Sequence, residues 1–143
     1  MNELTEIEQN IIENLENSLV LDNPPKITQQ RFDSIIDVLI KEDRRELMWR
    51  LCGTYSNYNY NKVIDYFIDK KDSWYVEELI CFVDGELDQE YLVNKMIETK
   101  DKEFINDALS LCGHCMEAYL EPHLLKKIYL FLAMLVVLIS AFS

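Results

Sequence analysis

The amino-acid sequence predicts an all-α protein, a bundle of six to seven short antiparallel helices followed by one C-terminal transmembrane helix. Three observations support this prediction. Apolar residues recur with helical spacing along almost the whole chain. The alternation of apolar and polar residues that is typical of strands is absent. Only three glycines and three prolines interrupt the 143 residues, which favours helices with few tight turns.

The first half of the chain contains signals for three helices. We expect the first from about Thr5 to Leu19, and the proline pair after Asn23 ends it because proline lacks an amide donor. A second helix begins after Thr28, whose hydroxyl can cap it. The charged run 41–45 then marks a turn or a solvated junction, before a third helix that ends near Gly53. The apolar stripe of the second helix consists of Phe32, Ile35, Ile36, Leu39 and Ile40.

Four further helices are expected at about 63–68, 72–85, 88–99 and 104–120. Each carries apolar residues on one face, and polar residues such as Asp88 precede the first turn where they can cap it. No internal repeat is convincing in the sequence. The soluble part is therefore expected to be one helical bundle domain over residues 1–121 that faces the cytosol.

The C-terminal segment indicates a membrane anchor over residues 122–143. The sixteen residues from Ile128 to Ser143 carry no charged side chain. A helix of that length covers about 24 Å, close to the hydrocarbon core of a thin bilayer. A buried C-terminal core helix is the alternative. The residues expected at the membrane are Lys126, Lys127, Ile128, Leu130, Phe131, Leu135, Val136, Leu138 and Ile139.

The net charge of -12 limits the classes of partner. It comes from 26 acidic residues against 14 lysines and arginines, spread along the chain. Because such a surface repels nucleic acid, we expect protein partners that bring a basic or helical surface. The N-terminal residues lack the basic and apolar regions of a secretory signal peptide, so the four cysteines are expected to stay reduced.

The most specific short motif is Cys112-Gly113-His114-Cys115. It matches the active-site motif of protein disulfide isomerases, but the strand and thioredoxin fold that such thiols need have no counterpart in the sequence. Zinc binding is a second use, with weak candidates in Cys112, Cys115, His114 and His123. The third reading is two cysteines on a helix that partly faces the core. Neither a metal nor another cofactor is therefore predicted.

No catalytic set emerges from the remaining polar residues. Acidic pairs flank apolar helix faces, where solvation is their usual role, and phosphate-binding glycine loops are missing from the sequence. We therefore expect a protein that is not an enzyme. The candidate interaction residues are acids and aromatic residues, namely Trp74, Glu77, Glu78, Asp84, Glu86, Asp88, Tyr55, Tyr58 and Tyr60. The three tyrosines are expected to form an exposed aromatic patch on a loop.

Two stretches carry a resemblance to a known family. Residues Glu46 to Cys52 read ELMWRLC, and residues Tyr75 to Ile80 read YVEELI. They look like the second and fifth helices of death-effector domains, so the segment from Phe32 to Met96 resembles the death fold. Trp74 and the residues after it also look like the fifth helix of a caspase-recruitment domain. Glu86-Leu87-Asp88 lacks the arginine of the family's Arg-x-Asp-Leu signature.

A second resemblance is to the Bcl apoptosis regulators, which also have a C-terminal membrane helix. Asp72-Ser73-Trp74 could stand in for the Asn-Trp-Gly-Arg entry to their central helix, although the glycine and the arginine are missing. This resemblance implies a groove near Leu39 and Asp43 that binds an amphipathic helix.

These observations together predict a non-enzymatic, tail-anchored helical interaction protein that regulates apoptosis or innate antiviral signalling. The alternatives are a Bcl-like apoptosis inhibitor and a membrane-anchored CxxC redox or zinc-binding protein. The expected location is the cytosolic face of the mitochondrial outer membrane or of the endoplasmic reticulum. Expected partners are other helical proteins and the membrane, without nucleic acid, and self-association is left open.

Overall fold

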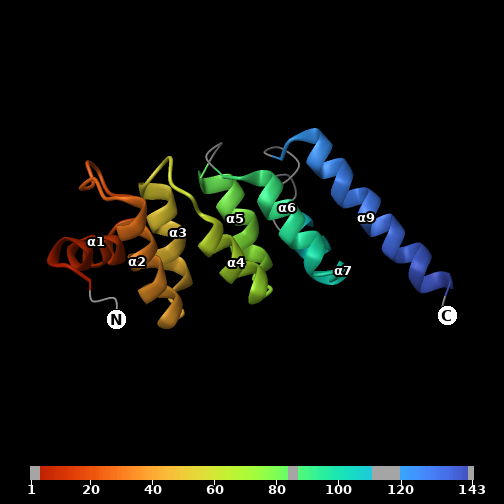
Figure 1. The fold of residues 1–143 in the computed structure, drawn as a ribbon, viewed down its shortest axis with the longest axis horizontal. Coiled ribbons are helices and arrows are strands. Elements are labelled where there is room, and N and C mark those ends of the chain that lie inside the picture. Colours follow the sequence, from red (N-terminus) through yellow and green to blue (C-terminus); the bar gives the residue numbers. More distant parts are fainter. Residues whose placement is uncertain (1–3, 84–86, 111–119, 142–143) are drawn as a thin grey trace.

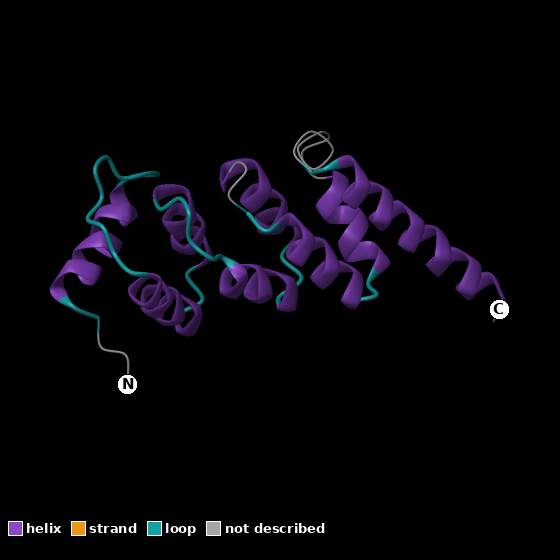
Figure 2. Cartoon of the chain, turned by 45° about the horizontal axis from the view of Figure 1, so that its top comes forward, coloured by secondary structure: helices purple, strands orange, loops and turns teal. Residues whose placement is uncertain are grey.

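A computed structural model describes residues 4–83, 87–110 and 120–141. This part of the chain contains eight helices and no strand, which confirms the all-α class (Figure 2). The helices are α1 (Glu6–Asn17), α2 (Gln29–Lys41), α3 (Arg45–Thr54), α4 (Asn61–Asp69), α5 (Ser73–Val83), α6 (Gln89–Glu98), α7 (Lys102–Ser110) and α9 (Pro122–Ala141).

Polar side chains cap several of the helices, and the caps at Thr28 and Asp88 were predicted from the sequence. Thr5 and Glu8 form a reciprocal capping box at α1, and the Thr28 hydroxyl accepts from the Arg31 amide at 3.2 Å. The Asp88 carboxylate accepts from the Tyr91 amide at 3.0 Å and caps α6. Each cap satisfies an amide that the first helical turn leaves without a partner, which is why these residue types begin helices.

The helices stack in two rows along an elongated molecule whose termini lie at opposite ends (Figure 1). In row A, α2 contacts α4, α4 contacts α6 and α6 contacts α9. In row B, α1 contacts α3, α3 contacts α5 and α5 contacts α7. The rows are joined by the pairs α2–α3 and α4–α5. We call each such pair of helices, one from each row, a layer. Each layer packs mainly on the layers before and after it, as in helical repeat proteins.

The turns inside the helix pairs reveal a repeat that the sequence analysis did not find. Asp43, Lys71 and Lys100 all have positive φ, at 53°, 55° and 53°, and they follow one another at 28 and 29 residues. After the first two of these turns, the amides of Arg44 and Asp72 bond back to the carbonyl five residues earlier, both at 2.9 Å. The expectation of no internal repeat was wrong, because the recurring turn uses aspartate and lysine instead of glycine.

The repeat also fixes which side chains are buried. Row A buries Ile36 in α2, Ile64 in α4 and Val93 in α6, each at 0% exposure, at the same place in successive pairs. Row B buries Met48, Val76 and Ile105 at equivalent places, with exposures of 0%, 1% and 0%. The core is thus one continuous column between the rows.

A ladder of polar contacts links successive helices of row A at equivalent positions. Lys62 donates to Asp37 at 2.8 Å, and the Tyr91 hydroxyl donates to Asp65 at 2.7 Å. In the next layer Lys127 of α9 donates to Asn94 of α6 at 2.5 Å. The acceptors Asp37, Asp65 and Asn94 lie 28 and 29 residues apart, so α9 takes the fourth position of row A.

The C-terminal helix exists, but the structure does not support its prediction as a transmembrane segment. None of the helices in 4–83, 87–110 and 120–141 has the length and apolar character needed to cross a membrane. Ile128, expected in the membrane, is fully buried in the core shared with the rest of the stack. Of the other predicted membrane residues, Lys126, Lys127, Leu130, Val136 and Leu138 are exposed and Phe131 and Leu135 are half-buried, while the Ile139 side chain lies outside the described part.

The ladder leads to a prediction at alkaline pH. The hydrogen bond to Asp65 raises the pKa of Tyr91 to about 12, above the ordinary value of about 10. This bond therefore contributes its full stabilisation below about pH 10 and loses it as the pH rises through about 12. We expect Tyr91→Phe to be less stable than the parent at pH 8, with a difference that shrinks towards pH 12. Urea unfolding across this pH range measures the difference in stability between the two proteins. A difference that does not change with pH would contradict the prediction.

Candidate interaction site

A cavity of about 660 Å³ opens where the α2–α3 turn meets α1, α3 and the start of α5. We call it the arginine pocket because it contains Arg44, Arg45 and Arg50, three of the four arginines in the chain. Its lining also includes Glu16, Asp43, Glu46, Leu47, Asp72 and Tyr75.

Arg45 lies between two carboxylates that belong to different helix pairs. It donates to Asp43 at 2.8 Å and to Asp72 at 2.7 Å. The Tyr66 hydroxyl also donates to Asp43, and the bonds from Arg45 and Tyr66 hold the pKa of Asp43 below its ordinary value. Asp72 in turn caps α5 by accepting from the Tyr75 amide at 3.2 Å. The pocket wall is therefore fixed by the same groups that join two successive layers.

The other two arginines connect α3 with α1. Arg50 donates to the Leu15 carbonyl at 2.7 Å and to Glu46 at 2.8 Å. Arg44 lies 3.4 Å from Glu16 of α1. All three guanidinium groups thus already have acceptors within the protein, and the pocket is a polar surface with fixed geometry.

Aromatic side chains extend this surface next to Arg45 and Arg50. Trp74 packs edge-on against Tyr75, with ring centroids 4.6 Å apart, and tilts against Trp49 at 6.2 Å. Tyr75 is itself stacked on Phe67 of the core at 5.2 Å. Trp74 nevertheless stays 42% exposed. We call Trp49, Trp74 and Tyr75 the tryptophan cluster; it holds a large aromatic surface in place while exposing it to solvent.

The acidic residues predicted beside Trp74 have different environments. Glu77 is only 1% exposed, so it is not accessible to a partner in this structure. Glu78 is half-buried, and Asp88 is exposed at the start of α6. Asp84 and Glu86 lie outside the described side chains.

The predicted tyrosine patch is a structural cluster, and its interpretation as an exposed surface was wrong. Tyr55 and Tyr60 are 5% and 2% exposed, and Tyr58 is half-buried. The hydroxyls of Tyr55 and Tyr58 donate to the carbonyls of Pro25 and Ile27, and that of Tyr60 donates to the Tyr55 carbonyl. Because each hydroxyl reaches a backbone acceptor, the rings can be buried and anchor the loop before α2.

The groove implied near Leu39 and Asp43 divides between two cavities. Asp43 lines the arginine pocket, whereas Leu39 lies at a second cavity of about 410 Å³ that α1 and α2 line. Leu39 itself is 1% exposed. Glu16 and Arg44, which form an ion pair, line both cavities.

The thiol and metal candidates fall mostly outside what the structure shows. Cys112, His114 and Cys115 lie in 111–119, outside the described residues. His123 is exposed, 3.4 Å from Glu121. Within the described part, no group of histidine, cysteine and acidic residues could hold a metal ion. Burial raises the pKa of the Cys52 thiol, which keeps it protonated and unreactive.

The pocket arginines were missed at the sequence level. The run 41–45 was interpreted as a turn or a solvated junction, and the turn is correct. The signal that could have found the pocket is the concentration of three arginines between 44 and 50 in an acidic chain that has only one other arginine. The carboxylate of Asp72 reaches this region only through the stacking of α5 on α3.

Comparisons with protein-family models, with curated proteins and with solved structures find no match for this chain. The resemblances to the death fold and to the Bcl regulators therefore stay predictions from the sequence.

Proposed function

We propose that this chain is a non-catalytic helical-repeat protein that binds a partner protein through the tryptophan cluster and the arginine pocket. The observation that carries the proposal is Trp74, which is 42% exposed although two aromatic neighbours fix its position. Tryptophan, tyrosine and arginine are the residues that most often dominate binding energy at protein interfaces. A side chain held in place before binding loses less conformational entropy on association.

The chemistry of the pocket supports binding over catalysis. Among its described lining residues none is a cysteine, serine, threonine, lysine or histidine, and each arginine is held by a carboxylate of the same chain. The pairs Arg44–Glu16 and Arg45–Asp72 connect groups from different helix pairs, so they contribute to a rigid surface. Stacked helix pairs offer extended surfaces of this kind to protein partners.

A basic, helical segment is the partner that this surface fits best. The pocket lining contains four carboxylates and three guanidinium groups, so the carboxylates are in excess. The whole chain also carries a net charge of -12. A lysine or arginine of the partner could also lie over the exposed Trp74 ring, an arrangement that favours cations. The charge would speed the encounter, and the aromatic contact would supply the affinity.

Trp74→Ala is expected to weaken binding of a basic peptide roughly thirtyfold, the equivalent of about 2 kcal/mol. The probe is a dye-labelled amphipathic helix with lysine and arginine along one face, titrated with the full chain by fluorescence anisotropy. A matched peptide with glutamate in place of these residues should not bind. Raising the salt from 0.1 to 1 M should weaken binding further, because the screening length falls from about 10 to about 3 Å.

Ile7→Ala serves as the matched control variant, since Ile7 is 57% exposed on α1 and does not line the arginine pocket. It should bind the basic peptide like the parent chain. Equal binding by Trp74→Ala and the parent, or tighter binding of the glutamate peptide, would reject the proposal.

The narrower function, regulation of apoptosis or innate antiviral signalling at a mitochondrial or endoplasmic-reticulum membrane, rests on the sequence resemblances and on the apolar C-terminal segment. It stays a prediction.

A further inference from the structure

Helix α9 is twice as long as the helix on which it packs. It has 20 residues against 10 in α6. Among its described side chains, the buried ones are Leu124, Ile128 and Leu132, which lie within the first eleven residues. Beyond them the described side chains 133–138 are exposed or half-buried, and α9 extends past the ends of α6 and α7 (Figure 1). The second half of α9 is therefore an apolar helix with much of its surface open.

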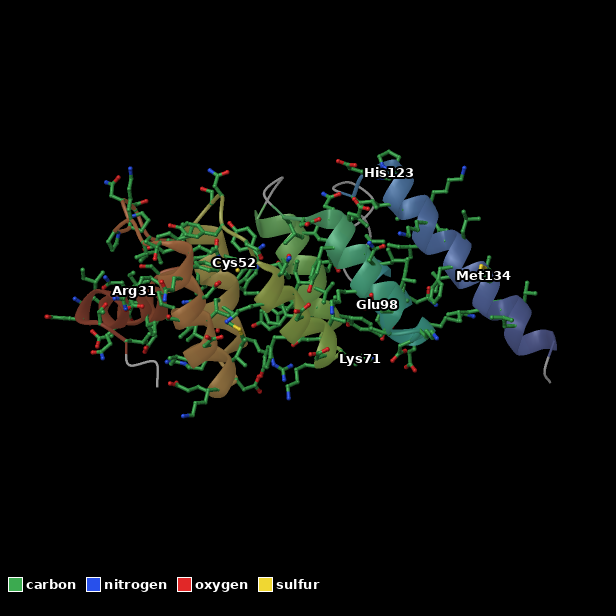
Figure 3. The ribbon with its side chains drawn as sticks, viewed as in Figure 1. Arg31, Cys52, Lys71, Glu98, His123 and Met134 are labelled. Carbon is green, nitrogen blue, oxygen red and sulfur yellow. The ribbon has the colours of Figure 1, made fainter. Side chains whose placement is uncertain are left out.

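The exposed surface of α9 has a regular pattern. Leu130, Met134 and Leu138 are 59%, 58% and 50% exposed and follow one another at four-residue spacing, which places them in one row along the helix. Met134 lies near the end of the molecule opposite to α1 (Figure 3). Val137, at 66% exposure, flanks this row. The row reads the same in both directions, with a methionine between two leucines.

We propose that two copies of this chain pair through α9, antiparallel, about a two-fold axis at Met134. In this arrangement Met134 meets Met134 of the second copy, and Leu130 meets Leu138 in both directions. A two-fold interface brings the same surface of both subunits together, so each apolar residue of this row meets an apolar residue of the second copy. Ridges of residues four apart are also the surfaces that pack most often between helices.

The charges of α9 favour the same arrangement. The chain carries a net charge of -12, so most of its surface repels a second copy. Helix α9 contains no acidic residue, and its lysines, Lys126 and Lys127, lie near its start. An antiparallel pair places Lys126 beside the C-terminal end of the second α9, where the helix dipole is negative. A parallel pair would instead bring the lysines of both copies together.

Sedimentation equilibrium of the full chain over a range of concentrations tests this pairing. The parent should show a dimer, and Met134→Glu should raise the dissociation constant at least about tenfold, because two carboxylates would meet in an apolar contact. Ile7→Glu is the matched control: it places the same charge on an equally exposed apolar position of α1 and should leave the dimer unchanged. A parent chain that stays monomeric, or a Met134→Glu variant that dimerises like the parent, would overturn the proposal.

A second measurement does not depend on the charge substitution. Met134→Cys should form a disulfide-linked dimer under mild oxidation much faster than Ile7→Cys or the parent, because only residue 134 would meet its own copy. Equal rates would contradict the two-fold axis. Sedimentation with phosphatidylcholine vesicles tests the alternative that the exposed apolar surface of α9 binds a lipid membrane. A monomer that binds vesicles, and loses this binding in Met134→Glu, would replace the second copy with a membrane surface.

Discussion

Replacing Phe67 with alanine is expected to lower the free energy of unfolding by about 3–5 kcal/mol. Phe67 is 0% exposed in α4, and its ring stacks on Tyr75 of α5 at 5.2 Å with 19° between the planes. It therefore fills the space between row A and row B at the middle of the stack. Since a domain of this size has only about 5–15 kcal/mol of stability in total, the loss should be large.

The same substitution should also loosen the candidate site. Tyr75 holds Trp74, so removal of the ring below Tyr75 leaves the tryptophan cluster without its support from the core. Urea unfolding followed by circular dichroism measures the stability, and hydrogen exchange shows which layers open first, because stacked repeats need not unfold together. Phe67→Leu is the control, with an expected cost below that of alanine. Equal stability of the alanine variant and the parent would show that the two rows do not depend on this contact.

Ile128→Ala is expected to cost about 2–5 kcal/mol, because it opens a cavity where α9 packs on the stack. Ile128 has no exposed surface, while Lys127 beside it continues the polar ladder from α6. The substitution separates the two interpretations of the C-terminal segment. A helix docked as the fourth member of row A must lose packing energy, whereas an anchor held away from the bundle would leave the bundle unchanged.

Val136→Ala is the matched control, since Val136 lies on the same helix and is 45% exposed. It should change the stability by no more than about 0.5 kcal/mol. Amide exchange in α6 provides a local measurement, because loss of α9 from the stack would expose the adjacent face of α6. Unchanged stability and unchanged exchange in Ile128→Ala would contradict the docking of α9.

The helices and their starts were determined by the sequence to a large extent. Thr28 and Asp88 cap helices as predicted, the first helix begins next to Thr5, and the break at the proline pair separates α1 from α2. These features are local: a capping side chain reaches an amide three residues away, and an apolar stripe reflects the helical period of the same segment. The all-α class followed from such signals alone.

Only the tertiary structure decided which helix surfaces are buried and which distant residues they contact. The tyrosines of the loop before α4 were predicted to be exposed, but Tyr55 finds its acceptor at Pro25, thirty residues away along the chain. Arg45 obtains its second carboxylate from Asp72, and the C-terminal apolar segment obtains its neighbour from α6. Whether an aromatic, charged or apolar residue is buried depends on which distant groups satisfy its polar atoms and cover its surface. Periodicity and composition carry no information about those distant groups, so only the stacking of the layers could settle them.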